Sequence, residues 1–309
     1  MPPMRILFVT STRIGDAVLS TGLLDHLLRT HPGARITVAC GPAAEGVFAR
    51  MPGRERTIVV AKRPFSMHWP VLWAQVAGTV WDLVVDLRGS ALGWLVPARR
   101  RVVMRGGRRP GHRLGHIAAV LRLDPPPHPV AWFAPEDSRR AAALLGDDRP
   151  VLALGPTANW DGKVWPAGRF VDLARALLGP GGALEGARPV LLGGPGEVER
   201  AMAAPVVAAL PDALDLVGRL SLPEAAALLA RGRLFVGNDS GLMHLSAAAG
   251  APTLGLFGPT PAGEYGPVGR AARAVVSSDG TMAGLAVERA LGAAQDLLAA
   301  APLPAPLHA

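Results

Sequence analysis

The sequence predicts an α/β protein made of two domains, each with a parallel β-sheet between layers of helices. The chain has 309 residues, about twice the length of an ordinary domain. Short apolar segments alternate with segments of helical periodicity, and strands that alternate with helices form parallel sheets covered on both faces. The alternation starts again after the polar segment Gly146–Pro150. We therefore expect an N-terminal domain over residues 1–148 and a C-terminal domain over residues 149–309.

The elements of the first domain are indicated by apolar runs and the turn residues that end them. Arg5–Thr10 is short, apolar and ends in small polar residues, which is typical of a buried parallel strand. Leucines at helical spacing over Ala17–Leu28 predict a helix that ends before Pro32 and Gly33. Further strands are expected at Arg35–Cys40, Thr57–Ala61, Leu83–Leu87 and Arg101–Met104, and further helices at Glu45–Arg50, Met67–Val80 and Glu136–Leu145.

The second domain is expected to repeat this alternation. Its predicted strands are Val151–Leu154, Pro189–Leu192, Leu214–Val217, Leu234–Gly237 and Thr253–Phe257. Its predicted helices are Ala167–Leu178, Glu197–Leu210, Leu222–Ala230, Leu242–Ala249 and the amphipathic Val287–Ala300, for which packing back on the N-terminal domain stays open. Ligands of such sheets bind beyond the carboxyl ends of the strands, so we expect the site in a central cleft that the two sheets face.

Composition excludes several classes of protein. Hydrophobic residues make up 50% of the chain and charged residues 18%, which excludes intrinsic disorder. Cys40 is the only cysteine, so neither an internal disulfide nor a cysteine-based zinc site is possible, as fits a reducing cytoplasm. The first apolar run is too short for a signal peptide, and no stretch reaches the roughly 18 apolar residues of a membrane-spanning helix. We therefore expect a cytoplasmic protein with at most peripheral membrane contact.

The positive charge of the chain is concentrated in the predicted N-terminal domain. Residues 1–148 hold 20 Arg and Lys against 11 Asp and Glu, a net charge of +9, whereas residues 149–309 hold 12 against 13, a net charge of −1. The densest stretch contains no acidic residue and consists of Arg99, Arg100, Arg101, Arg105, Arg108, Arg109 and Arg113. It favours an anionic partner, such as nucleic acid, a phospholipid surface or a phosphorylated glycolipid, although a solvated face explains it equally well.

The most specific segment of the chain is Phe235–His244, where a predicted strand runs through Asn, Asp, Ser and Gly into a helix. The unpaired N–H groups and the positive dipole end of a helix that begins at Ser240 and Gly241 suit a diphosphate. His244 lies one helical turn further on the same face, where it can donate to a phosphate. The alternative is that Asp239 or Ser240 only caps the helix.

Three further polar residues follow predicted strands. Lys163 is one of only two lysines among 32 basic residues, so it marks a position that favours a compact ammonium and a phosphate contact over an ordinary surface lysine. Glu197 follows a Gly-rich turn and can accept hydrogen bonds from ribose hydroxyls or complement a helix dipole. The turn lacks the order Gly-x-Gly-x-x-Gly, which argues against a dehydrogenase. Asp16 opens the first helix and can act as a general base or as a helix cap.

Four segments in this order resemble the motifs of the bacterial heptosyltransferase family, glycosyltransferase family 9, which builds the inner core of lipopolysaccharide. They are Arg13–Asp16, Lys163–Pro166, Asn238–His244 and Leu256–Thr260, within a resemblance that extends from Met4 to about Gly269. The resemblance implies a GT-B fold with two Rossmann-like domains, an N-terminal one for the acceptor and a C-terminal one for the nucleotide-sugar donor. It implies inverting transfer of heptose from ADP-heptose to the inner core or a related glycolipid, with no cofactor and no metal required for catalysis.

The resemblance also implies roles for single residues. Asp16 is the expected catalytic base. The expected donor contacts are Thr157, Asn159, Lys163, Glu197, Asp239, Ser240, Gly241 and His244. Because the acceptor is an anionic glycolipid at the inner-membrane surface, we expect acceptor contacts from Arg13, Arg88, Arg105, Arg108 and Arg109.

Two alternatives stay open: a GT-B glycosyltransferase that uses another nucleotide sugar, and a nucleotide-sugar binding protein without catalytic activity. Asp16 and Lys163 argue against the second, because simple binding does not require a base. Nucleic-acid binding is not expected, since no recognisable motif with interleaved aromatic residues accompanies the arginines. We expect a monomer.

Overall fold

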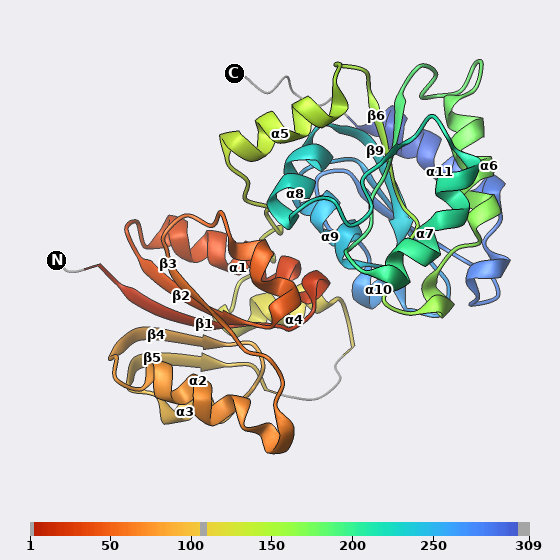
Figure 1. Ribbon diagram of the computed structural model, residues 1–309. Helices are drawn as coiled ribbons and strands as arrows, with labels where there is room; N and C mark the ends of the chain where they lie inside the picture. The colour runs from red at the N-terminus through yellow and green to blue at the C-terminus, as the bar shows by residue number, and fades with distance from the viewer. Residues whose placement is uncertain (1–2, 106–109, 302–309) are drawn as a thin grey trace. The chain divides into compact units, whose positions relative to one another are not determined.

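The computed structural model describes residues 3–105 and 110–301, and the chain divides into two compact units, Met1–Trp132 and Phe133–Ala309. Figure 1 shows that each unit contains a β-sheet with helices on both of its faces. The predicted α/β class with two Rossmann-like domains is thereby confirmed.

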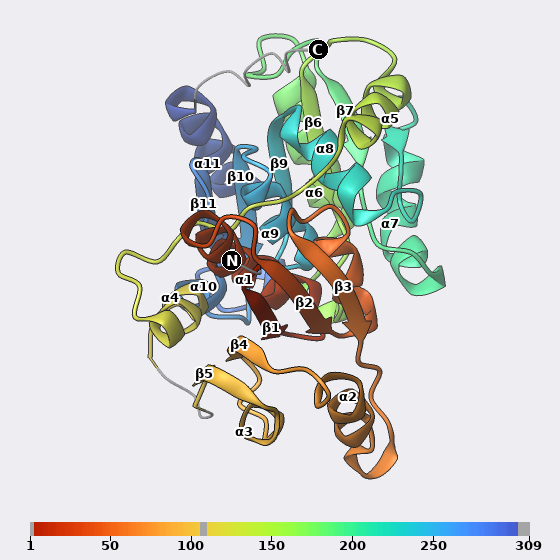
Figure 2. The same cartoon turned by 90° about the vertical axis from the view of Figure 1, so that its left-hand side faces the viewer.

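Unit 1 is built on five parallel strands in the order β3-β2-β1-β4-β5. They are β1 (Arg5–Val9), β2 (Arg35–Cys40), β3 (Arg54–Val59), β4 (Trp81–Asp86) and β5 (Ala98–Val103). Helices α1 (Ile14–Thr30) and α4 (Arg113–Ala118) lie on one face of this sheet, and α2 (His68–Val76) and α3 (Leu92–Leu95) lie on the other (Figures 1 and 2). All five predicted strands are confirmed, whereas the predicted helix Glu45–Arg50 is the 3₁₀ helix η1 (Pro42–Phe48).

The first strand is buried on both faces, which is why it reads as one apolar run. Leu7 and Val9 face a cluster that contains Leu72 and Val76 of α2 and Leu92 of α3. The polar residues that follow β1 and β4 therefore lie together at the carboxyl edge of the sheet, because β1 and β4 are parallel neighbours.

Unit 2 is built on six parallel strands in the order β11-β10-β9-β6-β7-β8. They are β6 (Val151–Gly155), β7 (Arg188–Leu191), β8 (Leu214–Asp215), β9 (Gly232–Asn238), β10 (Thr253–Phe257) and β11 (Ala272–Val276). The helices are α5 (Pro135–Leu145), α6 (Ala167–Leu178), α7 (Glu197–Ala209), α8 (Leu222–Ala230), α9 (Gly241–Ala248), α10 (Ala262–Tyr265) and α11 (Val287–Ala300). The edge strand β11 was not predicted, because its burial pattern is broken and it forms no apolar run.

The boundary between the units lies before α5, so the predicted boundary at residues 148/149 is too late. Helix α5 packs against α8, where Arg140 approaches Glu224. The loop after α5 is also fixed to unit 2, since Asp147 accepts hydrogen bonds from Arg188 on β7 and from Arg149. The bond from Arg188 is the main cause that lowers the pKa of Asp147 to about 2. Gly146–Pro150 is thus a tethered turn within unit 2 and not an interdomain linker.

The core of unit 2 fixes the loop between β6 and α6. Trp165 is fully buried, contacts the ring of Phe170 edge-on at 5.1 Å and donates its indole N–H to the carbonyl of Leu285 at 2.9 Å. Its backbone N–H donates to Oδ1 of Asn238 at the end of β9, at 3.0 Å. Helix α11 packs on α6, β10 and β11 of the same unit.

The single cysteine provides a prediction about reactivity. Cys40 ends β2 and is buried, and burial raises the pKa of its thiol to about 12, with the nearby carboxylate of Glu45 adding to the effect. Because only the thiolate is alkylated, labelling at pH 8 should be slower than that of a free thiol by about a thousandfold. Timed iodoacetamide labelling followed by intact mass measures this rate, and denaturant should restore fast labelling. Rapid labelling in native buffer would contradict the buried position.

Candidate active site

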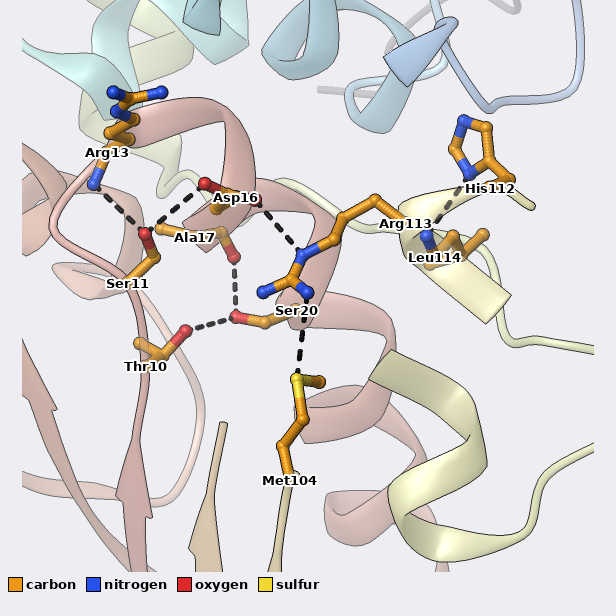
Figure 3. Close-up of polar contacts among 10 residues, drawn as sticks. All are labelled: Thr10, Ser11, Arg13, Asp16, Ala17, Ser20, Met104, His112, Arg113 and Leu114. Atoms are coloured by element: carbon orange, nitrogen blue, oxygen red, sulfur yellow. Dashed lines mark hydrogen bonds and ion pairs between the residues drawn. The ribbon is translucent and has the colours of Figure 1, made fainter. Parts of the chain in front are cut away.

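Asp16 lies in the first turn of α1, where the chain has just left β1 at the carboxyl edge of the unit 1 sheet. The hydroxyl of Ser11 accepts from the backbone N–H of Arg13 at 3.2 Å and points to Oδ2 of Asp16 at 3.5 Å (Figure 3). The helix begins after Arg13 without a side-chain cap from any residue that the structure describes. The polar partners of the Asp16 carboxylate are thus the side chains of Ser11 and Arg113, while its place in the first turn also complements the helix dipole.

Arg113, the first residue of α4, holds the Asp16 carboxylate from the other side. Its Nε lies 3.3 Å from Oδ1 of Asp16, and its Nη1 lies 3.6 Å from the sulfur of Met104 (Figure 3). The side chains of Arg113 and Asp16 are 30% and 25% exposed, so the pair is partly shielded from water. His112 fixes the start of α4, because its Nδ1 accepts from the N–H of Leu114 at 3.1 Å.

A polar cavity of about 230 Å³ opens at this pair. It is lined by residues that follow β1 and β4 and by two residues of α4: Thr10, Ser11, Thr12, Asp16, Leu87, Arg88, Arg113 and Ile117. The Asp16 carboxylate beside the Arg113 guanidinium can accept a proton from a hydroxyl, while the arginine binds an anionic group on the same molecule. The cavity is thus suited to an anionic molecule that carries a hydroxyl group.

The predicted acceptor arginines do not all gather at this cavity. Arg88 lines it, held by its backbone N–H to the buried Asp86 at 2.8 Å, and its guanidinium lies 5.0 Å from the ring centre of Trp69. Arg13 and Arg105 are exposed. Arg108 and Arg109 lie outside the described residues.

Two further arginines of the stretch are already bound within unit 1, because Arg99 pairs with Asp82 at 2.9 Å and Arg101 bonds to the carbonyls of Val96 and Ala98. Sequence reasoning placed Arg113 in that stretch but not at the site. Arg113 and Asp16 are 97 positions apart in the chain, so no local sequence pattern predicts their contact.

In unit 2, the turn from β9 to α9 presents an open helix end. The residue before the helix is Ser240, which gives no side-chain cap to α9, and its Oγ is buried without a hydrogen-bond partner within the described part of the chain. Gly241 begins the helix, so its first amides and the Ser240 hydroxyl are free to meet an anion. The alternative that Asp239 or Ser240 merely caps this helix is therefore wrong.

Lys163 reaches this turn from the loop that Trp165 anchors. Its Nζ lies 2.6 Å from Oδ2 of Asp239, with the two side chains 19% and 8% exposed. His244 is buried one turn into α9, and its backbone N–H points to the Ser240 carbonyl at 3.5 Å. The structure thus brings Lys163, Asp239, Ser240, Gly241 and His244 into one local cluster of the second unit.

The loops after β6 and β7 meet beside this cluster, since the strand order places β6 between β9 and β7. Buried Thr157 donates to Oε2 of Glu199 at 2.7 Å, and the same carboxylate oxygen accepts from the N–H of Gly194 at 2.5 Å. The predicted contacts Glu197 and Asn159 are both exposed at this edge. Glu199 was not predicted, although an acid two positions after Glu197 in the first turn of α7 was a visible signal.

Several known proteins resemble this chain in sequence and in fold. A sequence model of Glycosyltransferase family 9 (heptosyltransferase) matches residues 117–293. Lipopolysaccharide heptosyltransferase 1 of Pseudomonas aeruginosa is 30% identical over 86% of this chain and 82% of its own length. Lipooligosaccharide heptosyltransferase 2 of Haemophilus influenzae is 26% identical over 83% of this chain and 84% of its own.

The solved structure of E. coli ADP-heptose lps heptosyltransferase II covers 96% of this chain and 99% of its own, with a TM-score of 0.77 and 22% identity. That likeness shows the GT-B fold. Together with the relatives and the matched family model, it establishes that this chain is a glycosyltransferase and belongs to glycosyltransferase family 9, the heptosyltransferase family.

Proposed function

We propose that this enzyme transfers heptose from ADP-heptose to the inner core of lipopolysaccharide or a related anionic glycolipid, with inversion at the anomeric carbon. The observation that carries the donor assignment is the Lys163–Asp239 pair beside the uncapped amino end of α9. The acceptor class is supported by the carboxylate and two arginines in the unit 1 cavity and by the names of the relatives. Unit 1 is thus the proposed acceptor domain and unit 2 the proposed donor domain.

In the proposed reaction, the Asp16 carboxylate accepts the proton of the acceptor hydroxyl. The freed oxygen bonds to the anomeric carbon of heptose, while the bond from that carbon to the diphosphate oxygen breaks and ADP leaves with its electron pair. Lys163 and the amide groups at the start of α9 stabilise the negative charge that grows on the diphosphate, and His244 is the proposed additional donor. Because these groups stabilise the leaving diphosphate, the proposed reaction uses no cofactor and no catalytic metal.

The proposed location is the cytoplasmic face of the inner membrane, with peripheral contact and a monomeric enzyme. The net charge of +9 over residues 1–148 supports attraction to an anionic leaflet. Along the residues that the structure covers, no helix combines the length and apolar character that crossing a bilayer demands.

The function is tested by ADP release with ADP-heptose, with and without a deacylated inner-core acceptor, together with the mass of the glycolipid product. A panel of other nucleotide sugars identifies a different donor if one is used. Release only with acceptor, and a product heavier by one heptose, is the expected result. If the protein bound ADP-heptose without any turnover, it would instead be a nucleotide-sugar binding protein without catalytic activity.

The two acids at the start of α7 should have separable roles. Glu197→Ala should weaken ADP binding about threefold to tenfold, because it removes a proposed ribose contact worth about 0.5–1.5 kcal/mol. Glu199→Ala should lower the free energy of unfolding by about 1–3 kcal/mol, because it leaves the buried Thr157 hydroxyl and the Gly194 N–H without their partner. Calorimetry with ADP and denaturant titration measure the two effects. If Glu199→Ala alone weakened ADP binding, the ribose contact would belong to Glu199.

A further inference from the structure

An apolar face on α2 and α3 of unit 1 is not used by the proposed chemistry. A groove of about 770 Å³ lies between the two helices, with Trp69 and Trp73 from α2 and Leu92 and Leu95 from α3 in its lining. The indole N–H of Trp73 donates to the Leu95 carbonyl at 3.0 Å, which joins the two helices. We give the name α2–α3 face to this groove together with the exposed apolar side chains of α2, of α3 and of the loop before α2: Phe65, Met67, Trp73, Trp94 and Leu95.

Large apolar side chains are unusually exposed on the α2–α3 face. Phe65 is 98% exposed, Trp94 63%, Leu95 65%, Met67 51% and Trp73 44%. Helix α2 contains no charged residue. Its exposed side carries Pro70, Val71, Trp73 and Ala74 with one polar residue, Gln75, while its inner side packs Leu72 and Val76 into the core. A surface helix of a soluble domain normally shows a polar outer face, and a contiguous apolar patch marks an interaction site.

The loop before α2 presents the most exposed of these side chains in a costly conformation. Phe65 and Ser66 have φ angles of 50° and 57°, in the left-handed region that a bulky residue rarely adopts. This backbone places an aromatic ring in solvent, where it makes no stabilising contact in exchange. Strain of this kind concentrates at functional positions, which fits a ring held ready for a partner.

The charged residues around the α2–α3 face are basic, which favours an anionic partner. Residues 56–81 and 87–95, which supply the face, contain no Asp or Glu, but they contain Lys62, Arg63 and Arg88. The acidic residues between these segments are already bound, because Asp82 pairs with Arg99 and the buried Asp86 accepts from Ser90 and Arg88. The partner is therefore apolar and anionic at once.

We propose that the α2–α3 face binds the interface of an anionic phospholipid bilayer. The tryptophan and phenylalanine rings lie at the level where headgroups meet acyl chains, and the basic side chains meet lipid phosphates. A second copy of this chain does not fit, because it brings the same positive charge to the contact. Nucleic acid is the less favoured partner, because no recognisable nucleic-acid-binding motif accompanies these rings, whereas a lipid interface explains the exposure of Met67 and Leu95.

This inference deepens the proposed function, on which it rests for the choice of membrane. Arg88 lines both the groove and the Asp16 cavity. An acceptor embedded in the same bilayer therefore lies close to the Asp16 carboxylate. Its anionic core can bind Arg88 as it enters the cavity.

The test uses the purified full chain and the double variant Phe65→Ser/Trp94→Ser. The matched control is Val198→Ser/Val276→Ser, which removes two apolar side chains of unit 2 that are 70% and 37% exposed. Flotation with vesicles of phosphatidylcholine, with and without phosphatidylglycerol, should show wild-type binding to the anionic vesicles only. The double variant should lose about tenfold or more in partition coefficient, because it lacks two aromatic side chains that insert into the bilayer in the proposed complex. The control should bind like wild type.

Two further measurements separate this inference from the proposed function. Lipids brominated on their acyl chains should quench wild-type tryptophan fluorescence, and Trp94→Phe should reduce the quenching. Turnover of a deacylated, water-soluble acceptor should be unchanged in the double variant, whereas turnover of a vesicle-embedded acceptor should fall. Equal flotation of wild type and double variant, or no quenching, overturns the inference even if the enzyme is active. Normal flotation without any heptose transfer overturns the proposed function and leaves the α2–α3 face as a lipid-binding surface.

Discussion

Replacing Asp16 with asparagine is expected to lower turnover by about 10²–10⁴-fold, the usual contribution of a general base. The amide has the shape of the carboxylate and can still accept from the Ser11 hydroxyl, but it cannot take a proton from the acceptor. The lost ion pair with Arg113 is partly exposed, so stability should change by less than about 1 kcal/mol. Affinity for ADP should be unchanged, because Asp16 belongs to unit 1 and the proposed donor site to unit 2. Steady-state ADP release and calorimetry measure both quantities.

The chain offers a matched control on the same helix. Asp25 of α1 also pairs with an arginine, Arg29, at 2.8 Å, but it lines neither the Asp16 cavity nor the apolar groove. Asp25→Asn removes one carboxylate and one ion pair from α1 and should leave turnover at the wild-type level. If folded Asp16→Asn also kept near wild-type turnover, Asp16 would serve only to hold Arg113, and the proposed base would have to be sought elsewhere.

Elements with a strong apolar pattern could be predicted from the sequence, with bounds close to the observed ones. The helices Ala167–Leu178, Leu222–Ala230 and Val287–Ala300 and the strand Thr253–Phe257 have the predicted ends, because buried faces impose a clear periodicity. The edge strand β11 was not predicted, because an exposed edge strand shows no clear periodicity of apolar residues. The domain boundary was misplaced because Gly and Asp at 146–148 signal a turn equally well inside a domain, and only the packing of α5 on α8 decides which unit owns it.

The candidate site divides in the same way. Asp16, Lys163 and Asp239 could be predicted because each follows a strand, and parallel strands deliver such residues to one edge of a sheet. The partners of these residues could not. Arg113 meets Asp16 across 97 positions and Glu199 meets Thr157 across 42, and both contacts depend on tertiary folding alone. The α2–α3 face shows the same limit, because the sequence predicts a tryptophan-rich helix there but not which rings remain in solvent.

Replacing Lys163 with alanine is expected to weaken ADP binding by about 10- to 100-fold. A hydrogen bond to a charged group contributes about 1.5–3 kcal/mol, and about 1.4 kcal/mol corresponds to a tenfold change in affinity. The variant also leaves Asp239 without its cation at 8% exposure, where an unpaired carboxylate repels the diphosphate. Turnover should fall further than affinity, because charge on the leaving diphosphate grows in the transition state.

This second contribution can be separated from the first with one more variant. In Lys163→Ala/Asp239→Asn the repelling carboxylate is absent, so part of the lost ADP affinity should return, although the lysine contact does not. The matched control is Lys62→Ala, which removes the only other lysine of the chain from unit 1 and should leave ADP affinity unchanged. Calorimetry across the four proteins, with thermal unfolding to verify the fold, measures each step. Unchanged ADP affinity in Lys163→Ala would remove this lysine from the donor site and leave its pair with Asp239 as a structural contact of the loop.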